Sequence, residues 1–416
     1  MNENKTNVPE TTANPSWNDA AIRGVIDSAK KAGKLTGAEF IDRLPVPSRN
    51  FIAVGMGDGG CNIAAAIGKA LPSVFTIGYN TSNKGMTNLH LDAHIYPDGE
   101  DGSGKARSYS QDVFRQAAHK TLIATIQQAA QSEKMINLEY ILVITTVAGG
   151  TGGGTSPMAA KFIADNMNVP VIIMGVYPNI NEDTTALYNT MAWQDEVLRT
   201  GLPYIILDNT NEIVEGHDST SIFATHEKVN AQAVEIVNIL AGKMFGETNI
   251  TAIDNRDMYM LLQHIGGRIA VYGTVNRPGV GKSLDEMLLN VFTKWNQPVP
   301  TTAKGIGLFL KGPEDMIRNA DTSLTKLRSI FGDFAVQYTH LEVSDEVYVA
   351  LVCSGCDVPE GKLRTIRQKY DEMLAAVKTQ DFNMTGITSG IKSPLGDTRT
   401  SKVKSTTEID LSALDL

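Results

Sequence analysis

The fold is decided by residues 145–157, which read TTVAGGTGGGTSP and carry five glycines within six positions. An apolar run, Tyr140 to Ile144, precedes this stretch, and a helix-compatible run, Met158 to Asn166, follows it. We therefore expect a strand, a glycine loop and a helix, with Ser156 as N-cap and Pro157 in the first helical position. Bare N–H groups at a helix N-terminus favour an anion, and glycine permits positive φ and close approach of a phosphate. The stretch predicts an anion-binding loop rather than a flexible glycine linker.

The composition is that of a globular chain with a sizeable core. Its 416 residues are 42% hydrophobic and 20% charged, which suggests two or three domains. The net charge of −9 argues against direct binding of nucleic acid over a broad surface. The three cysteines form no disulfide framework, which predicts a reducing, cytoplasmic setting. An apolar run of 18 residues and a signal-peptide segment are both missing from the sequence, so we expect no direct membrane contact.

Strand and helix patterns alternate through the first half of the chain. The apolar strand patterns are at 51–54, 74–77, 140–145, 169–176 and 204–207, and the helical ones at 63–70, 111–131, 158–166 and 183–198. This alternation predicts an α/β domain whose parallel sheet is covered on both faces. Ligands bind at the carboxyl ends of such strands, where the chain has loops at 55–62, 80–82, 102–105, 149–155, 178–183 and 208–209. One nucleotide site can draw on all of these loops.

A long helical pattern at 225–245 divides the chain. We expect a disordered N-terminus at 1–20, a nucleotide-binding domain at 21–224, this central helix, a smaller α+β domain at 246–377 and a flexible tail at 378–416. The smaller domain shows a strand at 304–311, helices at 313–330 and 361–377, and two strands at 334–343 and 346–353 that we expect to pair as a hairpin.

Three further motifs have ordinary structural explanations. The Gly55-x-Gly57-x-x-Gly60 pattern matches a dinucleotide fingerprint, but the second strand ends in YNTS without the acid that a ribose needs. Residues 279–283, GVGKS, lack the first glycine of a P-loop, because that position is Asn276. Cys353-x-x-Cys356 has no second pair, so plain buried thiols are favoured over a zinc or redox site.

Asp254 and Asp257 form the most open motif. Their spacing fits the N-cap and first turn of a helix at 258–263, where the dipole favours acids. It fits equally a pair of carboxylates that polarise a water molecule. The spacing alone leaves both interpretations open.

Taken together, the loops resemble those of the tubulin/FtsZ superfamily of polymerising GTPases, over roughly residues 51–377. The family signature, Gly-Gly-Gly-Thr-Gly-(Thr/Ser)-Gly, is similar to AGGTGGG at 148–154, with Ala148 and Gly153 as small replacements. Cys61 departs similarly in the first loop, where a glycine or alanine is usual. The resemblance implies a parallel-sheet GTP-binding domain joined by a central helix to a GTPase-activating α+β domain.

The resemblance also implies roles for individual residues. It identifies Asn209, with Asn230 on the central helix, as reading guanine, and Glu182 and Asn189 as contacting the ribose. It identifies Asp254 and Asp257 as the acidic loop that triggers hydrolysis, which favours the catalytic interpretation of that pair. The full set expected to hold GTP or GDP, with Mg²⁺, is Asp58, Gly59, Gly60, Cys61, Asn62, Asn80, Gly102, Ser103, Gly104, Lys105, Gly149, Gly150, Thr151, Gly152, Gly153, Glu182, Asn189, Asn209 and Asn230.

The length of the central helix supports hydrolysis between subunits. Its 21 residues span roughly 30 Å at about 1.5 Å each. The helix starts beside the base and ends just before the acidic loop, so Asp254 and Asp257 cannot reach the nucleotide of their own chain. A head-to-tail contact that brings them to the next subunit's nucleotide produces an open filament.

Within the superfamily, several details resemble the TubZ group of plasmid and phage partition proteins. These are GSGKAR at 102–107, the AGGTG core, Glu182-Asp183 before NTMAW at 189–193, and TEIDL at 407–411. The resemblance implies DNA segregation through a DNA-binding adaptor. The tail, with Lys392, Arg399, Lys402 and Lys404, fits an adaptor contact and a solvated linker equally. The second domain is similar to that of FtsZ, so an FtsZ-like division filament stays open, as does a GTP-binding module that does not polymerise.

Overall fold

The computed structural model describes residues 50–97, 100–132, 135, 138–209, 222–242, 250–273, 287, 292, 295, 297–332 and 335–379. The predicted disordered N-terminus, the GVGKS motif and the basic residues of the tail lie outside these residues. The described residues up to Asp371 belong to one compact unit, and Glu372–Thr379 belong to a second.

Ten strands form one sheet in the order β3-β2-β1-β4-β5-β6-β7-β10-β8-β9. The strands are β1 (Asn50–Met56), β2 (Phe75–Tyr79), β3 (Ala93–Ile95), β4 (Leu138–Thr146), β5 (Val171–Tyr177), β6 (Tyr204–Asp208), β7 (Arg268–Gly273), β8 (Gly305–Gly312), β9 (Val336–Val343) and β10 (Tyr348–Cys356). Neighbouring strands from β3 to β7 run parallel, as the alternating pattern predicts.

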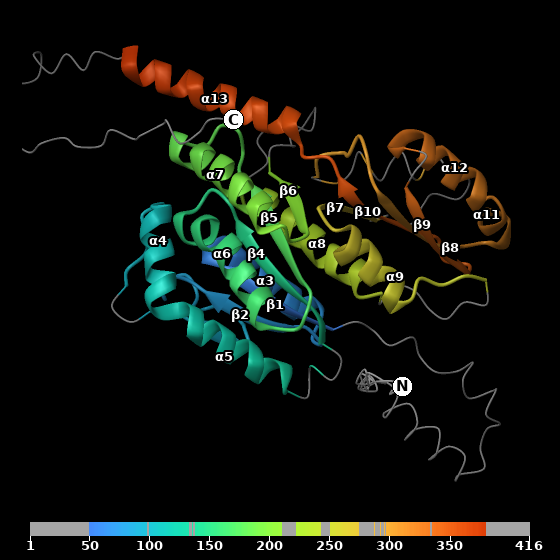
Figure 1. Ribbon diagram of the computed structural model, residues 1–416, viewed down its shortest axis with the longest axis horizontal. Helices are drawn as coiled ribbons and strands as arrows, with labels where there is room; N and C mark the ends of the chain where they lie inside the picture. Colours follow the sequence, from blue (N-terminus) through green and yellow to red (C-terminus); the bar gives the residue numbers. More distant parts are fainter. Residues whose placement is uncertain are drawn as a thin grey trace, which may run out of the picture. The chain divides into compact units, whose positions relative to one another are not determined.

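Helices lie on this sheet and around it (Figure 1). They are α3 (Gly57–Ala70), α4 (Arg107–Val113), α5 (His119–Ala130), α6 (Gly150–Asn166), α7 (Thr184–Thr200), α8 (Ile222–Leu240), α9 (Asn255–Tyr259), α11 (Glu314–Arg318), α12 (Ala320–Phe331) and α13 (Glu360–Thr379), with π-helical turns η1 (Phe114–Ala118) and η3 (Met260–Ile265). All residues of β5 are buried, and successive side chains of a strand point to opposite faces, so both faces of the sheet are covered there. The α/β prediction is confirmed. None of the described helices has the length and apolar character needed to cross a membrane.

The predicted hairpin of the second half is wrong. β9 and β10 do not pair with each other, because β8 lies between them, parallel to β9 and antiparallel to β10. The preceding helical pattern, 313–330, is split into α11 and α12 around Asn319. These helices form the crossover that a parallel β8–β9 pair requires, which a tight turn cannot provide.

The helix after the glycine stretch begins seven residues earlier than predicted. α6 starts at Gly150 with Gly149 as N-cap, and Pro157 lies inside the helix. Ser156 does not cap the helix, because it also lies inside it. Its hydroxyl accepts a hydrogen bond from Trp193 Nε1 at 3.0 Å. The glycines are therefore helical residues, and their missing side chains let α6 approach the sheet.

A central glycine supplies a stability test of this packing. A Cβ on Gly175, in β5, would lie 2.3 Å from the ring of Trp193, which is fully buried. We expect Gly175→Ala to lower the free energy of unfolding by about 2–3 kcal/mol through overpacking. Urea unfolding midpoints measure the change.

The matched control is Gly361→Ala, at the start of α13, where an added Cβ meets no atom within 4 Å. This change should be neutral or stabilising by up to about 1 kcal/mol, because alanine favours helix. Equal midpoints for the two variants would contradict the packing argument.

Candidate nucleotide-binding site

The N-terminus of α6 has the features that favour an anion. Its N-cap, Gly149, makes no side-chain cap, and no acidic residue lies in the first turn. The N–H groups of the first turn therefore keep their partial positive charge for a ligand. The glycines at 149–154 do not use the positive φ that glycine permits, and the nearby left-handed residues are Gly57, Gly102, Gly104 and Lys105.

Thr151 joins three of the predicted loops. Its hydroxyl lies 2.7 Å from that of Thr81, at the end of β2, and donates to Ser103 Oγ at 3.1 Å. A Cβ on Gly150 would lie 2.5 Å from the Lys105 carbonyl carbon and 2.6 Å from Ser103 Oγ. The loop at 102–105 is thus held directly against the start of α6.

The first loop forms the start of α3. Asp58 lies in the first turn, and its Oδ1 accepts a hydrogen bond from Asn80 Nδ2 at 2.6 Å. Its backbone carbonyl accepts another from Asn62 Nδ2 at 2.8 Å. Any Cβ on Gly59 or Gly60 would lie 2.3 Å from the chain around β4, at Thr146 and Ile144 respectively. The structure therefore brings together Asp58 and Asn80, which come from two of the predicted loops.

Cys61 is a neutral neighbour of this loop. Burial, with the Asp58 carboxylate as a second cause, raises the pKa of its thiol to about 12. It therefore adds no negative charge beside an anion at neutral pH. Cys353 and Cys356 are also free and buried, which confirms the plain-thiol interpretation of Cys353.

Asn189 holds two of the loops together. The residue is only 1% exposed, and its side-chain amide donates to Ala148 O at 2.8 Å and to Lys105 O at 3.2 Å. Lys105 also pairs with Asp183, the N-cap of α7, at 2.5 Å. Glu182 precedes that cap, and burial raises the pKa of its carboxyl while Lys105 opposes the rise. Contact of Asn189 or Glu182 with a ribose stays a prediction.

Arg107 is a buried residue of the site that the sequence analysis did not single out. One guanidinium nitrogen donates to the Asn189 carbonyl at 3.2 Å, and another pairs with Glu196 at 2.5 Å. A cation in the first turn of a helix is opposed by the dipole, so it needs such partners. An arginine at the start of α4 was the only sequence signal for this contact.

Asn209 is the candidate reader of a base. Its backbone N–H donates to Tyr177 O at 3.1 Å, which fixes it at the end of β6. Its side-chain Oδ1 is buried and has no hydrogen-bond partner among the residues that the structure describes. An unpartnered buried acceptor is costly unless a ligand N–H completes it. Asn230 lies half-buried on α8, and no hydrogen bond joins it to Asn209 within the described residues.

Asp254 and Asp257 form a capping box at the start of α9. Asp254 Oδ1 accepts from the Asp257 N–H at 2.8 Å, and Asp257 Oδ2 accepts from the Asp254 N–H at 3.2 Å. The structural interpretation of this motif is therefore confirmed, and the catalytic one stays a prediction.

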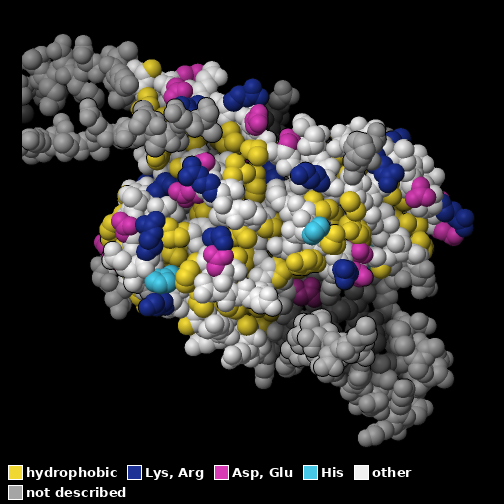
Figure 2. Space-filling model, in the orientation of Figure 1, with side chains coloured by type: hydrophobic (Ala, Val, Ile, Leu, Met, Phe, Trp, Pro, Cys, Tyr) yellow, Lys and Arg dark blue, Asp and Glu magenta, His cyan; other side chains and the backbone are white. Residues whose placement is uncertain are grey.

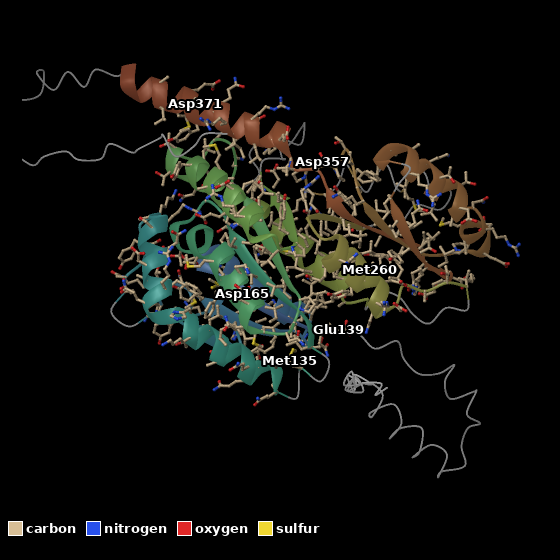
Figure 3. The ribbon with its side chains drawn as sticks, viewed as in Figure 1. Met135, Glu139, Asp165, Met260, Asp357 and Asp371 are labelled. Carbon is tan, nitrogen blue, oxygen red and sulfur yellow. The ribbon has the colours of Figure 1, made fainter. Side chains whose placement is uncertain are left out.

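The acids lie near the amino-terminal end of β4, whereas the glycine loop follows the carboxyl end of that strand. Asn255, between them, donates to Glu139 Oε1 at 2.7 Å, and Glu139 lies at the start of β4. The glycine loop follows the end of that nine-residue strand, which at about 3.3 Å per residue is roughly 25–30 Å long. Figure 3 labels Glu139 and Met260, the residue after α9, on the same side of the sheet.

No known family model matches the chain. The phage protein TubZ of Clostridium botulinum C phage is 29% identical over 180 residues, which are 41% of this chain and 48% of TubZ. The chain thus spans about half the length of that relative. The cell division protein FtsZ of Mycoplasmopsis pulmonis is 21% identical over 359 residues, which are 82% of this chain and 85% of FtsZ.

Among solved structures, a GTPγS-form protofilament of TubZ from Bacillus thuringiensis serovar israelensis aligns with a TM-score of 0.64 at 16% identity, covering 80% of this chain and 94% of that one. The chain has the tubulin/FtsZ fold. Its curated and structural neighbours are tubulin/FtsZ-family proteins, with TubZ and CetZ proteins among them, and the TubZ-like interpretation fits them.

The N-cap of α7 provides a stability test with a defined pH dependence. Lys105, followed by the Ala186 N–H, lowers the pKa of Asp183 below 3.8 by hydrogen bonding to the carboxylate. The stabilisation is therefore fully present above pH 4 and is lost as the pH falls through the lowered pKa. Asp183→Ala should cost about 1 kcal/mol at neutral pH, and the difference from wild type should disappear in acid.

The control is Asp195→Ala in the same helix, which removes an exposed ion pair with Arg199. Its effect should be at most about 0.5 kcal/mol. Urea titrations at pH 7, 5 and 3 test both variants. A loss for Asp183→Ala that does not exceed the control would show that the cap is unimportant.

Proposed function

We propose that the protein is a GTPase that assembles into head-to-tail filaments and hydrolyses GTP between adjacent subunits. The observation that carries the proposal is the contact of Asn255 with Glu139. This contact holds the two acids at the amino-terminal end of β4, a strand length away from the glycine loop. The similarity to proteins solved as GTPγS-bound protofilaments, TubZ and CetZ2, supports the same assembly.

A guanine nucleotide fits the residues at the carboxyl ends of the parallel strands. The uncapped starts of α3 and α6 would hold the phosphates through backbone N–H groups. The buried Oδ1 of Asn209 would accept a hydrogen bond from an N–H of guanine, and Asn230 would meet the base from α8.

Mg²⁺ would enter with the phosphates. The described residues contain no group of three or more His, Cys, Asp or Glu side chains that could hold a metal ion. Mg²⁺ commonly keeps several waters and binds phosphate oxygens together with few protein ligands. When bound, it would neutralise charge that develops on the phosphates.

The chemistry would be completed by the next subunit. Asp254 and Asp257 would orient the attacking water at the phosphates of the subunit whose carboxyl edge they meet. Because their own glycine loop is a full strand length away, an isolated subunit would hydrolyse GTP slowly. Assembly would therefore activate hydrolysis.

We propose plasmid or phage DNA segregation in the cytoplasm as the cellular role. The match to a phage TubZ supports this role. On the face seen in Figure 2, basic and acidic described side chains are interspersed, which suits attachment to DNA through an adaptor rather than directly. The FtsZ match over 82% of the chain favours cell division as the second candidate. Pull-down of a DNA-binding adaptor would distinguish the two.

The first test replaces the proposed catalytic acid. Asp257→Asn removes the carboxylate, yet its side-chain oxygen can still accept from the Asp254 N–H, so the cap of α9 is retained. We expect GTP affinity within about twofold of wild type, filaments that persist, and phosphate release reduced at least about 100-fold. Asp257→Ala should lose turnover equally and should also lose the hydrogen bond that the Asp257 side chain accepts from the Asp254 N–H. Electron microscopy and phosphate release measure these outcomes.

The control is Asp321→Asn, which neutralises an exposed acid in the first turn of α12. It should leave turnover unchanged. Normal hydrolysis by Asp257→Asn would falsify the assignment, and normal nucleotide binding without sedimentable filaments would favour a module that does not polymerise.

Mixing two inactive variants tests whether the site is shared. Asn209→Ala should bind GTP poorly but keep its acids, whereas Asp257→Asn should bind GTP but lack one acid. We expect turnover to recover in the mixture, because each acid-bearing surface can meet a loaded neighbour. If the mixture stays as inactive as its components, hydrolysis does not occur between subunits.

A further inference from the structure

A nearly buried ion pair links the C-terminal helix to the end of β6. Lys362 Nζ of α13 lies 2.8 Å from Asp208 Oδ2, and the two side chains are only 18% and 5% exposed. A carboxylate so poorly hydrated is stabilised by a close cation, and removing that cation disfavours its present position. Asp208 is the last residue of β6 and directly precedes Asn209.

The position of Asn209 depends on that of Asp208. Asp208 is in register with Tyr177 of β5, and the next N–H along the chain, that of Asn209, donates to the Tyr177 carbonyl. Any displacement of the Asp208 side chain therefore acts on the first residue beyond the strand. The Asn209 Oδ1 atom, buried and without a partner, is the acceptor that such a displacement would misplace.

α13 also contacts α7. The ring of Tyr370 lies 6.4 Å from that of Tyr188, measured between centroids. Tyr188 precedes Asn189, whose amide holds the glycine loop and the 102–105 loop together. In Figure 3, Asp357 and Asp371 mark the strand-to-helix connection and the body of α13. One helix thus supports both the base-reading and the loop-holding residues.

We propose that Lys362 is a positioning residue for base recognition, which acts on Asn209 through Asp208 without touching the nucleotide. This inference rests on the proposed binding of GTP. It makes the choice of guanine depend on the C-terminal helix, which is remote in sequence from every glycine loop.

The test compares GTP and ATP affinities by competition against a fluorescent guanine nucleotide. Guanine presents an N–H at position 1 and an exocyclic amine beside it, whereas adenine offers no N–H at position 1. For Lys362→Met we expect GTP affinity to fall about tenfold, the equivalent of one misplaced hydrogen bond, with ATP affinity unchanged. Lys362→Arg keeps the cation and should stay within about twofold of wild type.

Lys311→Met is the matched control. Lys311, on β8, is 19% exposed and pairs with Glu342 of β9 at 3.4 Å and with Glu346 at 3.2 Å. Its replacement removes a similarly enclosed cation and should leave the preference for GTP over ATP unchanged. If Lys362→Met does not fold, the double variant Asp208→Asn/Lys362→Met removes both charges, and its GTP preference should still be lower than that of wild type.

The outcomes separate the two proposals. A wild-type protein that binds no guanine nucleotide overturns both. A wild-type protein that prefers GTP, with a Lys362→Met variant that keeps this preference or loses GTP and ATP affinity equally, overturns only the role of Lys362.

Discussion

The close approach of backbone to backbone at the starts of α3 and α6 is the constraint on which the site depends. A Cβ on Gly152 would lie 2.3 Å from the Met56 carbonyl oxygen, and one on Gly57 would lie 2.8 Å from the Gly152 nitrogen. Gly57 also has a φ of +72°, which favours glycine. These contacts hold two helix N-termini side by side at the ends of β1 and β4. A single helix start binds an anion weakly, and two adjacent starts offer a polyphosphate twice the number of N–H groups.

The same sheet separates these two helix N-termini from the acids. β6 and β7 pair in parallel, with Tyr204 opposite Arg268 and Ile205 opposite Ile269, so the sheet continues from the first half of the chain into the second. Arg268 is buried and donates to the carbonyls of Pro298 and Asp357. The distance between the helix N-termini and the acids is therefore fixed by strand length and by the hydrogen bonds of the sheet. A hinge between the halves, which would let a chain fold its own acids over its nucleotide, would have to break this pairing.

The sequence predicted the first half of the fold well, because buried parallel strands appear as apolar runs and their loops carry the glycines. β7 was not predicted because it begins with Arg268, a charged residue whose burial depends on partners about 30 and 90 positions away. The wrong hairpin has a similar cause. Sequence proximity favoured pairing of β9 with β10, whereas the α11–α12 crossover returns β9 to the far side of β8. The pairs Arg107–Glu196 and Lys362–Asp208 join residues distant in sequence, and no local pattern indicates them.

The use of side chains in the loops explains why departures from the family signature can be accommodated. Thr151, Asn189 and Asp58 direct their polar atoms to neighbouring loops, so the ligand is left with backbone N–H groups and a few atoms such as Asn209 Oδ1. Recognition by backbone requires small residues rather than particular side chains, which Ala148 satisfies. At Gly153 the requirement is stricter, because a Cβ there would lie 2.1 Å from the Val147 carbonyl oxygen. The hydroxyl residue usual at this position would force α6 away from β4, so in this chain glycine at 153 preserves the helix start rather than weakening it.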